Sequence, residues 1–437
     1  MLGGKSHNVG DPDSNSPIDS LELQTKFAEV YGPGPGDIKI FFAPGRVNLI
    51  GEHTDYNGGN VMPVAISRGI YAAVRYFDRL DKRSVRLASL NEPGLVYLDL
   101  DRPSSYLAER GWGNYPAGVI EEIRKGGSPS HFQNEGEQPF CSYLETQSNQ
   151  WYADIRGCEV LFWGDLPVGA GLSSSAALEV LTAYLLMFPV FDDQVDRLWM
   201  AQLCQRAENC FVGVDCGIMD QFAVAMGKKD HALYLNCSSL AHSYVPLNLA
   251  GFELVVMNTN RKRSLYESRY NERRKECQLA LKMIREKNRE AHLDNLAQAS
   301  LDQVVKSFGT IENSVLARRA RHVITEDART SKARLFLSEG DVLGFGNLLV
   351  ESHNSLRYDY EVSCFELDVL VDAANSMHSC AGARMTGAGF GGCAISLVRQ
   401  EGLEEFKSEV GKIYYAKTGL RAEFYVCSAE DGVRCIL

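Results

Sequence analysis

A dense group of polar side chains lies near the start of the chain, in the segment APGRVNLIGEHTDYN at 43–57. The segment contains Arg46, Glu52, His53 and Asp55. Each of these groups needs a directional hydrogen-bond partner, so a segment buried only for stability would not place them so close together. Such a set suits a pocket that recognises several hydroxyl groups. From these residues alone, a solvated surface loop is an equally good interpretation.

A loop rich in glycine and serine follows at 164–177, with the sequence GDLPVGAGLSSSAA. Gly169 and Gly171 let the backbone approach a phosphate chain closely. Three serines then stand at the start of a predicted apolar helix, where free N–H groups and the helix dipole favour an anion: Ser173, Ser174 and Ser175. The alternative, an N-capped helix after a flexible turn, explains Ser173 but not the other serines and glycines. The segment therefore favours a phosphate-binding loop.

Two carboxylates lie in the segment RAENCFVGVDCGIMDQF at 206–222. Asp220 follows apolar residues, which predict a partly buried position. Glu208 lies on a predicted helix, where an exposed glutamate most often only faces solvent. A hard cation that bridges phosphates binds one or two carboxylates, and phosphoryl transfer to a hydroxyl needs an acceptor for the departing proton. The two residues therefore fit a phosphoryl-transfer site.

A second glycine-rich stretch, RMTGAGFGGC at 384–393, contains the spacing G-x-G-x-x-G. In a dinucleotide-binding fold this fingerprint opens a helix. Here the residues CAISLV follow it and predict a strand. The fingerprint fails its structural context, so a Rossmann fold is not expected.

These segments, in this order, resemble those of the galactokinases in the GHMP family of small-molecule kinases. Residues 43–57 resemble the N-terminal galactokinase signature, and 164–177 resembles the second GHMP motif, Pro-x-x-x-Gly-Leu-(Gly/Ser)-Ser-Ser-Ala. The block at 206–222 resembles the galactokinase segment Ala-Glu…Cys-Gly-Ile-Met-Asp-Gln. The stretch at 384–393 resembles the third GHMP motif, a loop that lies over the active site in that family.

The resemblance implies roles for individual residues. It makes Asp220 and Arg46 the catalytic pair at the anomeric hydroxyl of a sugar. It assigns sugar binding to Arg46, Glu52, His53, Asp55, Gly217, Asp220 and Tyr270, with Asp55 towards C3 and C4, and Glu52 and His53 towards C6. It assigns nucleotide binding to Trp112, near the adenine, and to the phosphate loop: Gly169, Gly171, Ser173, Ser174 and Ser175. It also implies ATP as co-substrate and a Mg²⁺ ion held by Ser175 and Glu208.

Length and composition limit the class of protein. A chain of 437 residues is too long for one compact core, which predicts two domains. The net charge of −11 argues against binding to nucleic acid or to a membrane surface, because both favour a basic face. The sequence shows no signal peptide, no stretch as long as a membrane span and no CxxC pair among its 12 cysteines. We therefore expect a cytoplasmic protein with reduced cysteines and no obligate protein partner.

Mixed strand and helix patterns predict an α+β protein whose site lies at the junction of the two domains. Strands are predicted at 69–76, 157–163, 231–236, 252–258, 393–398 and 422–427, and helices at 115–125, 173–188, 196–211, 266–293 and within 298–356. Residues 1–20 predict a disordered tail, and the polar stretch 126–153 predicts an inserted surface loop. The first domain is predicted at 21–235 and the second at 236–437. By resemblance, this is the GHMP architecture with the active site in the inter-domain cleft.

The leading expectation is ATP-dependent phosphorylation of the anomeric hydroxyl of α-D-galactose, the first committed step in the use of that sugar. Two alternatives stay open: an N-acetylgalactosamine kinase, and a catalytically silent sensor that binds galactose and ATP. One sequence does not show whether the pocket has room for an acetamido group. Ser175, Glu208 and Asp220 argue against the sensor, because the groups needed for the chemistry are present. A protein kinase is not supported, because the chain has no His-Arg-Asp or Asp-Phe-Gly motif.

Overall fold

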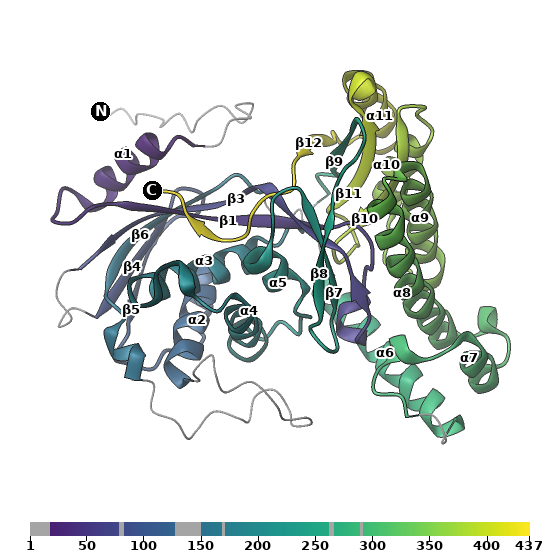
Figure 1. The fold of residues 1–437 in the computed structure, drawn as a ribbon, viewed down its shortest axis with the longest axis horizontal. Helices are drawn as coiled ribbons and strands as arrows, with labels where there is room; N and C mark the ends of the chain where they lie inside the picture. Colours follow the sequence, from purple (N-terminus) through teal and green to yellow (C-terminus); the bar gives the residue numbers. More distant parts are fainter. Residues whose placement is uncertain (1–17, 78–82, 127–149, 168–170, 262–265, 289–291) are drawn as a thin grey trace, which may run out of the picture.

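The structure of the chain, a computed structural model, describes residues 18–77, 83–126, 150–167, 171–261, 266–288 and 292–437. Two lobes of mixed sheet and helix lie side by side, as Figure 1 shows. This is the α+β architecture that the sequence predicts. The domain boundary at residue 235 stays a prediction, because the last strand of the chain, β13, pairs with β1 in the first lobe.

The first lobe is built on a six-stranded sheet with the order β13-β1-β3-β6-β4-β5. Its strands are β1 (Lys39–Asn48), β3 (Pro63–Tyr76), β4 (Ser84–Ser89), β5 (Leu95–Asp99), β6 (Cys158–Gly164) and β13 (Arg434–Cys435). Helix α1 (Ser20–Tyr31) covers one face through Leu23 and Phe27. The other face carries the remaining helices of this lobe (Figure 1): α2 (Asn114–Lys125), α3 (Ser174–Phe191), α4 (Arg197–Arg206) and α5 (Met219–Met226).

The second lobe contains an antiparallel four-stranded sheet with the order β10-β11-β9-β12. Its strands are β9 (Phe252–Asn258), β10 (Cys380–Thr386), β11 (Cys393–Arg399) and β12 (Glu423–Cys427). Its helices are α6 (Tyr266–Lys287), α7 (Leu301–Phe308), α8 (Val315–Glu339), α9 (Val342–Ser355), α10 (Phe365–Asn375) and α11 (Leu403–Thr418). Buried side chains from this sheet and from α6, α8, α10 and α11 form one apolar core.

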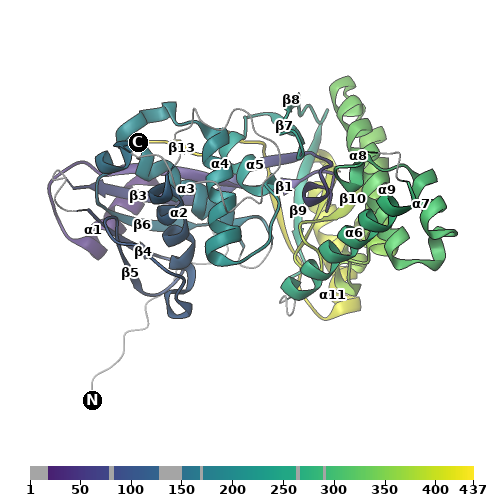
Figure 2. The same ribbon diagram turned by 90° about the horizontal axis from the view of Figure 1, so that it is seen from below.

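A shared apolar core ties the lobes together. Strand β1 runs from the first lobe to the second, as the view from below shows (Figure 2). A three-stranded sheet of β2 (Asn60–Val61), β7 (His231–Asn236) and β8 (His242–Pro246) lies beside this crossing. The shared core joins Val47 and Ile50 of the first lobe to Val256, Phe345 and Ile395 of the second. Burial of this apolar surface holds the two sides of any site between the lobes in a defined arrangement.

The observed elements differ from the predicted ones at a few positions. The helix predicted at 196–211 ends as an α-helix at Arg206 and continues as a π-helix over Ala207–Val212, a form found frequently at functional sites. The predicted tail is wrong at its end, because Asp19 caps α1 and the helix begins at Ser20. The rest of that tail, and 127–149 of the predicted insertion, lie outside the described residues.

Two expectations from composition also need correction. Residues 174–194, which include α3, form a helical stretch long and apolar enough to span a membrane by composition alone. This stretch packs in the core of the first lobe, which accounts for its apolar character. The expectation of reduced cysteines is wrong at Cys210, which is disulfide-bonded, whereas ten other described cysteines are free.

Candidate active site

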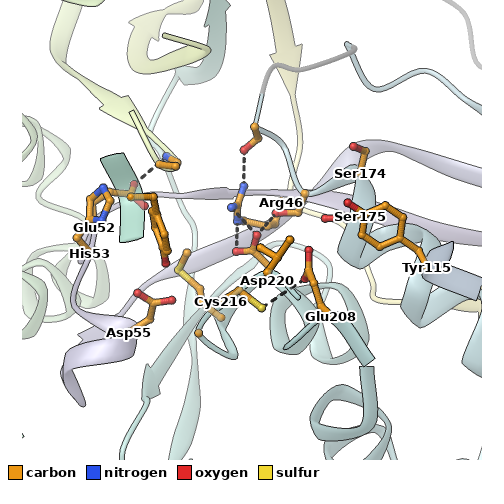
Figure 3. Close-up of a pocket in the computed structure, with 18 residues that line it drawn as sticks. Arg46, Glu52, His53, Asp55, Tyr115, Ser174, Ser175, Glu208, Cys216 and Asp220 are labelled. Carbon is orange, nitrogen blue, oxygen red and sulfur yellow. Dashed lines mark hydrogen bonds and ion pairs between the residues drawn. The ribbon is translucent and has the colours of Figure 1, made fainter. Parts of the chain in front are cut away.

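A polar cavity of about 250 Å³ lies where the two lobes meet, lined by residues of both (Figure 3). It brings together the turn after β1, the loop before α3, the π-helix, the start of α5 and the hairpin between β10 and β11. Every residue predicted for the catalytic pair and for sugar binding lines it: Arg46, Glu52, His53, Asp55, Gly217, Asp220 and Tyr270. Gly171, Ser173, Ser174, Ser175 and Glu208 line the same cavity. The tertiary structure therefore gathers segments that are far apart in the sequence.

Arg46 and Asp220 form a bidentate ion pair in the middle of this cavity. Nε and Nη2 of Arg46 donate to Oδ1 and Oδ2 of Asp220, each at 2.8 Å. Nη1 of Arg46 donates to the Gly171 carbonyl at 2.7 Å, and the Ser173 hydroxyl donates to Oδ2 of Asp220 at 2.6 Å. The register of β1 shifts between Pro44 and Arg46, and such an irregularity re-aims a side chain. The carboxylate is thus held directly beside the phosphate loop.

Asp55 and Gly217 pack closely on one side of the ion pair. A Cβ atom at Gly217 would lie 2.0 Å from Oδ2 of Asp55, so only glycine fits at this position. Burial, and then the neighbouring carboxylate of Asp220, raise the pKa of Asp55 to about 7. The Tyr270 ring lies at the same end, with its centre 5.6 Å from the His53 ring. This end of the cavity offers acceptors, a donor and aromatic surface, as a sugar requires.

His53 and Glu52 complete this end of the cavity. His53 adopts a positive φ of 61°, which is uncommon for a residue other than glycine. Nδ1 of His53 lies 2.8 Å from the Tyr56 hydroxyl, whereas Nε2 has no hydrogen-bond partner among the described residues. Oε2 of Glu52 accepts from Nη2 of Arg384 at 2.8 Å and from the Gly387 N–H at 3.0 Å. Glu52 therefore ties the first motif to the second lobe as well as lining the cavity.

The phosphate loop presents backbone N–H groups at the start of α3. Ser173 precedes the helix with a φ of 62°, and its hydroxyl bonds to Asp220 instead of capping the helix. The first helical bond runs from the Ala177 N–H to the Ser173 carbonyl. The N–H groups of the first turn, which include those of Ser174 and Ser175, are therefore free for an anion. Gly169 lies outside the described residues.

Buried acidic groups crowd the other side of the ion pair. Burial and the charge of Asp220 raise the pKa of Glu208, and burial and the charge of Glu208 raise the pKa of Glu179 well above its usual value. Nε2 of Gln221 bridges them, at 2.6 Å from Oε2 of Glu208 and 3.1 Å from Oε2 of Glu179. Ser175 is also a hydrogen-bond partner of Glu208. Carboxylates that repel one another beside a phosphate loop suit a divalent cation.

The described part of the chain contains no group of three or more His, Cys, Asp or Glu side chains placed to hold a metal by themselves. Mg²⁺ in kinases is bound by one or two carboxylates together with phosphates and water. Glu208 and Ser175 thus have the chemistry that the ion requires. Glu179, which sequence reasoning missed, is fully buried beside them, and its Oε1 has no described partner.

A second, more apolar cavity of about 220 Å³ begins on the far side of the phosphate loop. It shares Tyr115, Ser174 and Ser175 with the first cavity. Trp112, the residue predicted to lie near the adenine, lines it and packs edge-on against Phe162. Its other lining residues were not predicted: Ile70, Ser89, Asn91, Glu92, Phe162, Gly164, Leu166 and Leu178. Sequence reasoning missed them because they come from β3, from β4 and β6 with the segments that follow these two strands, and from α3, which meet only in the folded protein.

Helix α8 supports the signature from behind, and this support was also not predicted. Oε1 of the fully buried Glu326 accepts from the N–H groups of Gly51 and Glu52, at 3.0 and 3.3 Å, and from Ser352 at 2.6 Å. Burial alone would raise the pKa of Glu326, but Arg329 and other cationic neighbours together lower it to about 2. Only the long-range packing of α8 on the turn reveals this role.

The comparisons with known proteins agree with this geometry. The family model "GHMP kinases N terminal domain" matches residues 140–228, and "GHMP kinases C terminal" matches 333–416. A solved mevalonate kinase of Methanococcus jannaschii shares the fold, with a TM-score of 0.56 at 17% identity over 91% of this chain and 100% of that one. The fold and the site therefore define a small-molecule kinase of the GHMP class.

Closer relatives narrow the class. The model "Galactokinase galactose-binding signature" matches residues 25–76. The galactokinase of Bacillus subtilis is 45% identical over 94% of this chain and 98% of its own length, and that of Halalkalibacterium halodurans is 43% identical over 94% and 96%. The crystal structure of Lactococcus lactis galactokinase complexed with galactose matches with a TM-score of 0.82 at 38% identity, over 95% of this chain and 99% of that one. The chain belongs to the galactokinase family.

Proposed function

We propose that this protein transfers the γ-phosphoryl group of ATP to the anomeric hydroxyl of α-D-galactose and produces galactose 1-phosphate. As a member of the galactokinase family it is a phosphotransferase with an alcohol group as acceptor. One observation carries the proposal: the Arg46–Asp220 pair lies in a single cavity between the sugar end, with Asp55 and Gly217, and the phosphate loop. A hydroxyl bound between them would face the phosphoryl group.

Asp220 and Arg46 are the proposed catalytic pair. Asp220 orients the anomeric hydroxyl and accepts its proton, while Arg46 stabilises the ionised carboxylate and the charge that develops on the transferred group. The hydrogen bond from Ser173 and the bidentate contact from Arg46 leave the Asp220 carboxylate little rotational freedom. Because the transition state of phosphoryl transfer is loose, this orientation contributes as well as the proton transfer.

The sugar end is proposed to select galactose through paired hydroxyl contacts. Asp55 accepts from the C3 and C4 hydroxyls, while Glu52 and His53 face C6 and Tyr270 covers the ring. Glucose differs from galactose only in the orientation of the C4 hydroxyl, so it would leave a buried polar group unpaired. Such a loss reduces binding strongly when the partner is buried.

The nucleotide is proposed to lie across the phosphate loop. The adenine occupies the apolar cavity beside Trp112, and the phosphates meet Gly169, Gly171 and the serines Ser173, Ser174 and Ser175. Ser175 and Glu208 would hold Mg²⁺, which when bound supplies positive charge that neutralises the phosphates. We infer that the enzyme works in the cytoplasm on these small molecules, without nucleic acid, membrane or an obligate protein partner.

Turnover with a panel of sugars tests this function. Purified protein with ATP and Mg²⁺ should release ADP when galactose is added, and much less with glucose or N-acetylgalactosamine. The Asp220→Asn variant is the matched control for contaminating kinases. Comparable kcat/KM values for galactose and glucose would contradict the sugar assignment. Binding of galactose and ATP without turnover would instead indicate the silent sensor; the comparisons support neither this nor an N-acetylgalactosamine kinase.

A further inference from the structure

A series of hydrogen-bonded side chains extends from His53 into the second lobe, away from the cavity. We call this series, which runs from His53 through Tyr56 and Tyr360 to Cys277, the relay. Nδ1 of His53 lies 2.8 Å from the Tyr56 hydroxyl, which lies 2.8 Å from the Tyr360 hydroxyl. The Tyr360 hydroxyl lies 3.1 Å from Sγ of Cys277 on α6. Tyr360 and Cys277 are fully buried, and the Tyr360 ring packs against His322 with 4.5 Å between ring centres. The relay therefore links the sugar end of the site to the buried core of the second lobe.

The directions of the hydrogen bonds in the relay are coupled, because each hydroxyl has only one proton to donate. If Tyr56 donates to His53, it must accept from Tyr360, and Tyr360 must accept from the Cys277 thiol. If instead His53 donates to Tyr56, the Tyr56 proton finds an acceptor only in Tyr360, so the bonds reverse and the last hydroxyl donates to sulfur. A neutral imidazole carries its single proton on one nitrogen. The direction of these bonds therefore decides whether Nε2, the ring nitrogen without a described partner, is a donor or an acceptor.

Two arguments favour the direction towards His53. A neutral imidazole nitrogen accepts hydrogen bonds well, whereas sulfur accepts them weakly, so the chain is stronger when it ends on the ring. Burial, and then the nearby His322, lower the pKa of His53 to about 3, so the ring stays neutral. Nδ1 faces Tyr56, and Nε2 has no hydrogen-bond partner among the described residues, so a proton on Nε2 is not used by the protein.

We propose that Tyr56, Tyr360 and Cys277 act as positioning residues that hold His53 in the tautomer with the proton on Nε2. His53 then donates a hydrogen bond to a hydroxyl oxygen of the sugar, instead of accepting one from it. This inference rests on the proposed function for the identity of the sugar. The left-handed backbone at His53 and the position of its ring beside Glu52 aim it at the cavity (Figure 3). The relay pre-organises a donor before the sugar arrives.

The tautomer can be observed directly, without sugar or nucleotide. Long-range ¹H–¹⁵N NMR spectra of protein with ¹⁵N-labelled histidine distinguish a protonated from an unprotonated ring nitrogen, and loss of one signal set in a His53→Gln variant assigns His53. We expect a protonated Nε2 and an unprotonated Nδ1 in the unmodified enzyme. In Tyr56→Phe the two resonances should move towards each other, as the tautomers mix. A protonated Nδ1, or resonances unchanged by Tyr56→Phe, would overturn the proposal.

Kinetics test the consequence for the sugar. Loss of one hydrogen bond predicts that Tyr56→Phe raises KM for galactose about 3- to 10-fold with kcat nearly unchanged. Its KM for 6-deoxygalactose should hardly move, because that sugar lacks the hydroxyl that His53 is proposed to meet. Equal increases for both sugars would overturn the contact. Tyr360→Phe, with Tyr56 left in place, should show a smaller change in both experiments, and it replaces Tyr56→Phe if that variant does not fold.

Two further variants separate the relay from general damage. Cys277→Ser keeps a donor at the end of the chain and should behave like the unmodified enzyme, whereas Cys277→Ala should resemble Tyr360→Phe. Tyr414→Phe is the matched control, because it removes the hydroxyl of another fully buried tyrosine, which donates to the Thr259 carbonyl at 2.8 Å. A change in the His53 signals of this control would count against the relay. If the NMR result holds but galactose is not phosphorylated, the proposed function fails and the relay stands.

Discussion

The pH dependence of galactose binding offers a direct test of the sugar end of the site. Burial and the charge of Asp220 raise the pKa of Asp55 to about 7. An ionised carboxylate can accept hydrogen bonds from two sugar hydroxyls, whereas the protonated form keeps one oxygen as a donor. Binding is therefore expected to require the ionised form. As the pH falls through 7, Asp55 takes up a proton and galactose should bind more weakly.

The size of the effect follows from the ionised fraction. A carboxyl group with a pKa near 7 is about 90% ionised at pH 8 and about 10% ionised at pH 6, and the apparent Kd is the intrinsic Kd divided by this fraction. The Kd for galactose should therefore be about tenfold higher at pH 6 than at pH 8. Isothermal titration calorimetry without nucleotide measures it across this range. An Asp55→Asn variant should bind weakly at both pH values, with little dependence on pH.

Two neighbouring acids provide a matched comparison. Asp220→Asn removes the charge that, after burial, contributes most to the raised pKa of Asp55, so the inflection should move to lower pH. Glu208→Gln removes another buried acid of the same cavity that is not among the main contributors to this shift, and it should leave the inflection in place. Equal Kd values at pH 6 and pH 8 would refute the reasoning, as would an inflection that moves equally in both variants.

Three further predictions concern catalysis, metal binding and stability. Asp220→Asn should bind MgATP normally in calorimetry but lose about 10²- to 10⁴-fold in kcat for galactose, and Arg46→Ala should lose a large part of it; near-native turnover would place the catalytic role elsewhere. Glu208→Gln should need more Mg²⁺ for half-maximal ATP binding, and an unchanged Mg²⁺ titration would mean that the ion is held by other groups. Glu326→Gln should lower the free energy of unfolding at pH 7 by about 3 kcal/mol in urea denaturation, because the native pKa of this buried carboxylate is about 2. That contribution exists above the pKa of about 4.5 in the unfolded chain and is lost as the pH falls towards 2, so the difference between variant and unmodified protein should shrink in acid; a constant difference would contradict the role of the charge.

Much of the site could be predicted because its chemistry is concentrated in short segments. The turn at 43–57 and the loop at 164–177 each combine residue types that rarely occur together, and each is followed by a regular element that places it. The glycine spacing at 384–393 could also be interpreted correctly, since the next residues predict a strand and β11 is observed there. Local patterns of this kind can be interpreted from the sequence because they depend on backbone geometry and on near neighbours.

Other parts of the site depend on contacts between residues that are far apart in the sequence. Glu326 is a glutamate in a charged helix until α8 packs against the signature turn. Glu52 reads as a sugar ligand, and only the packed structure shows that one of its oxygens also bonds to Arg384 and Gly387. Ser173 reads as a helix cap, yet the folded loop turns its hydroxyl to Asp220. The polarity of these residues and the helical period of their segments could not indicate these partners.

The sequence by itself determined the residue types in each motif, the elements that carry them and, by resemblance, the family. The tertiary structure decided which side chains meet, and therefore their ionisation and their hydrogen-bond partners. The physical reason is the difference in range between the two kinds of interaction. Turns and helix starts are governed by neighbouring residues, whereas the pKa of Asp55 depends on burial and on the carboxylate of Asp220, which is far away in the sequence.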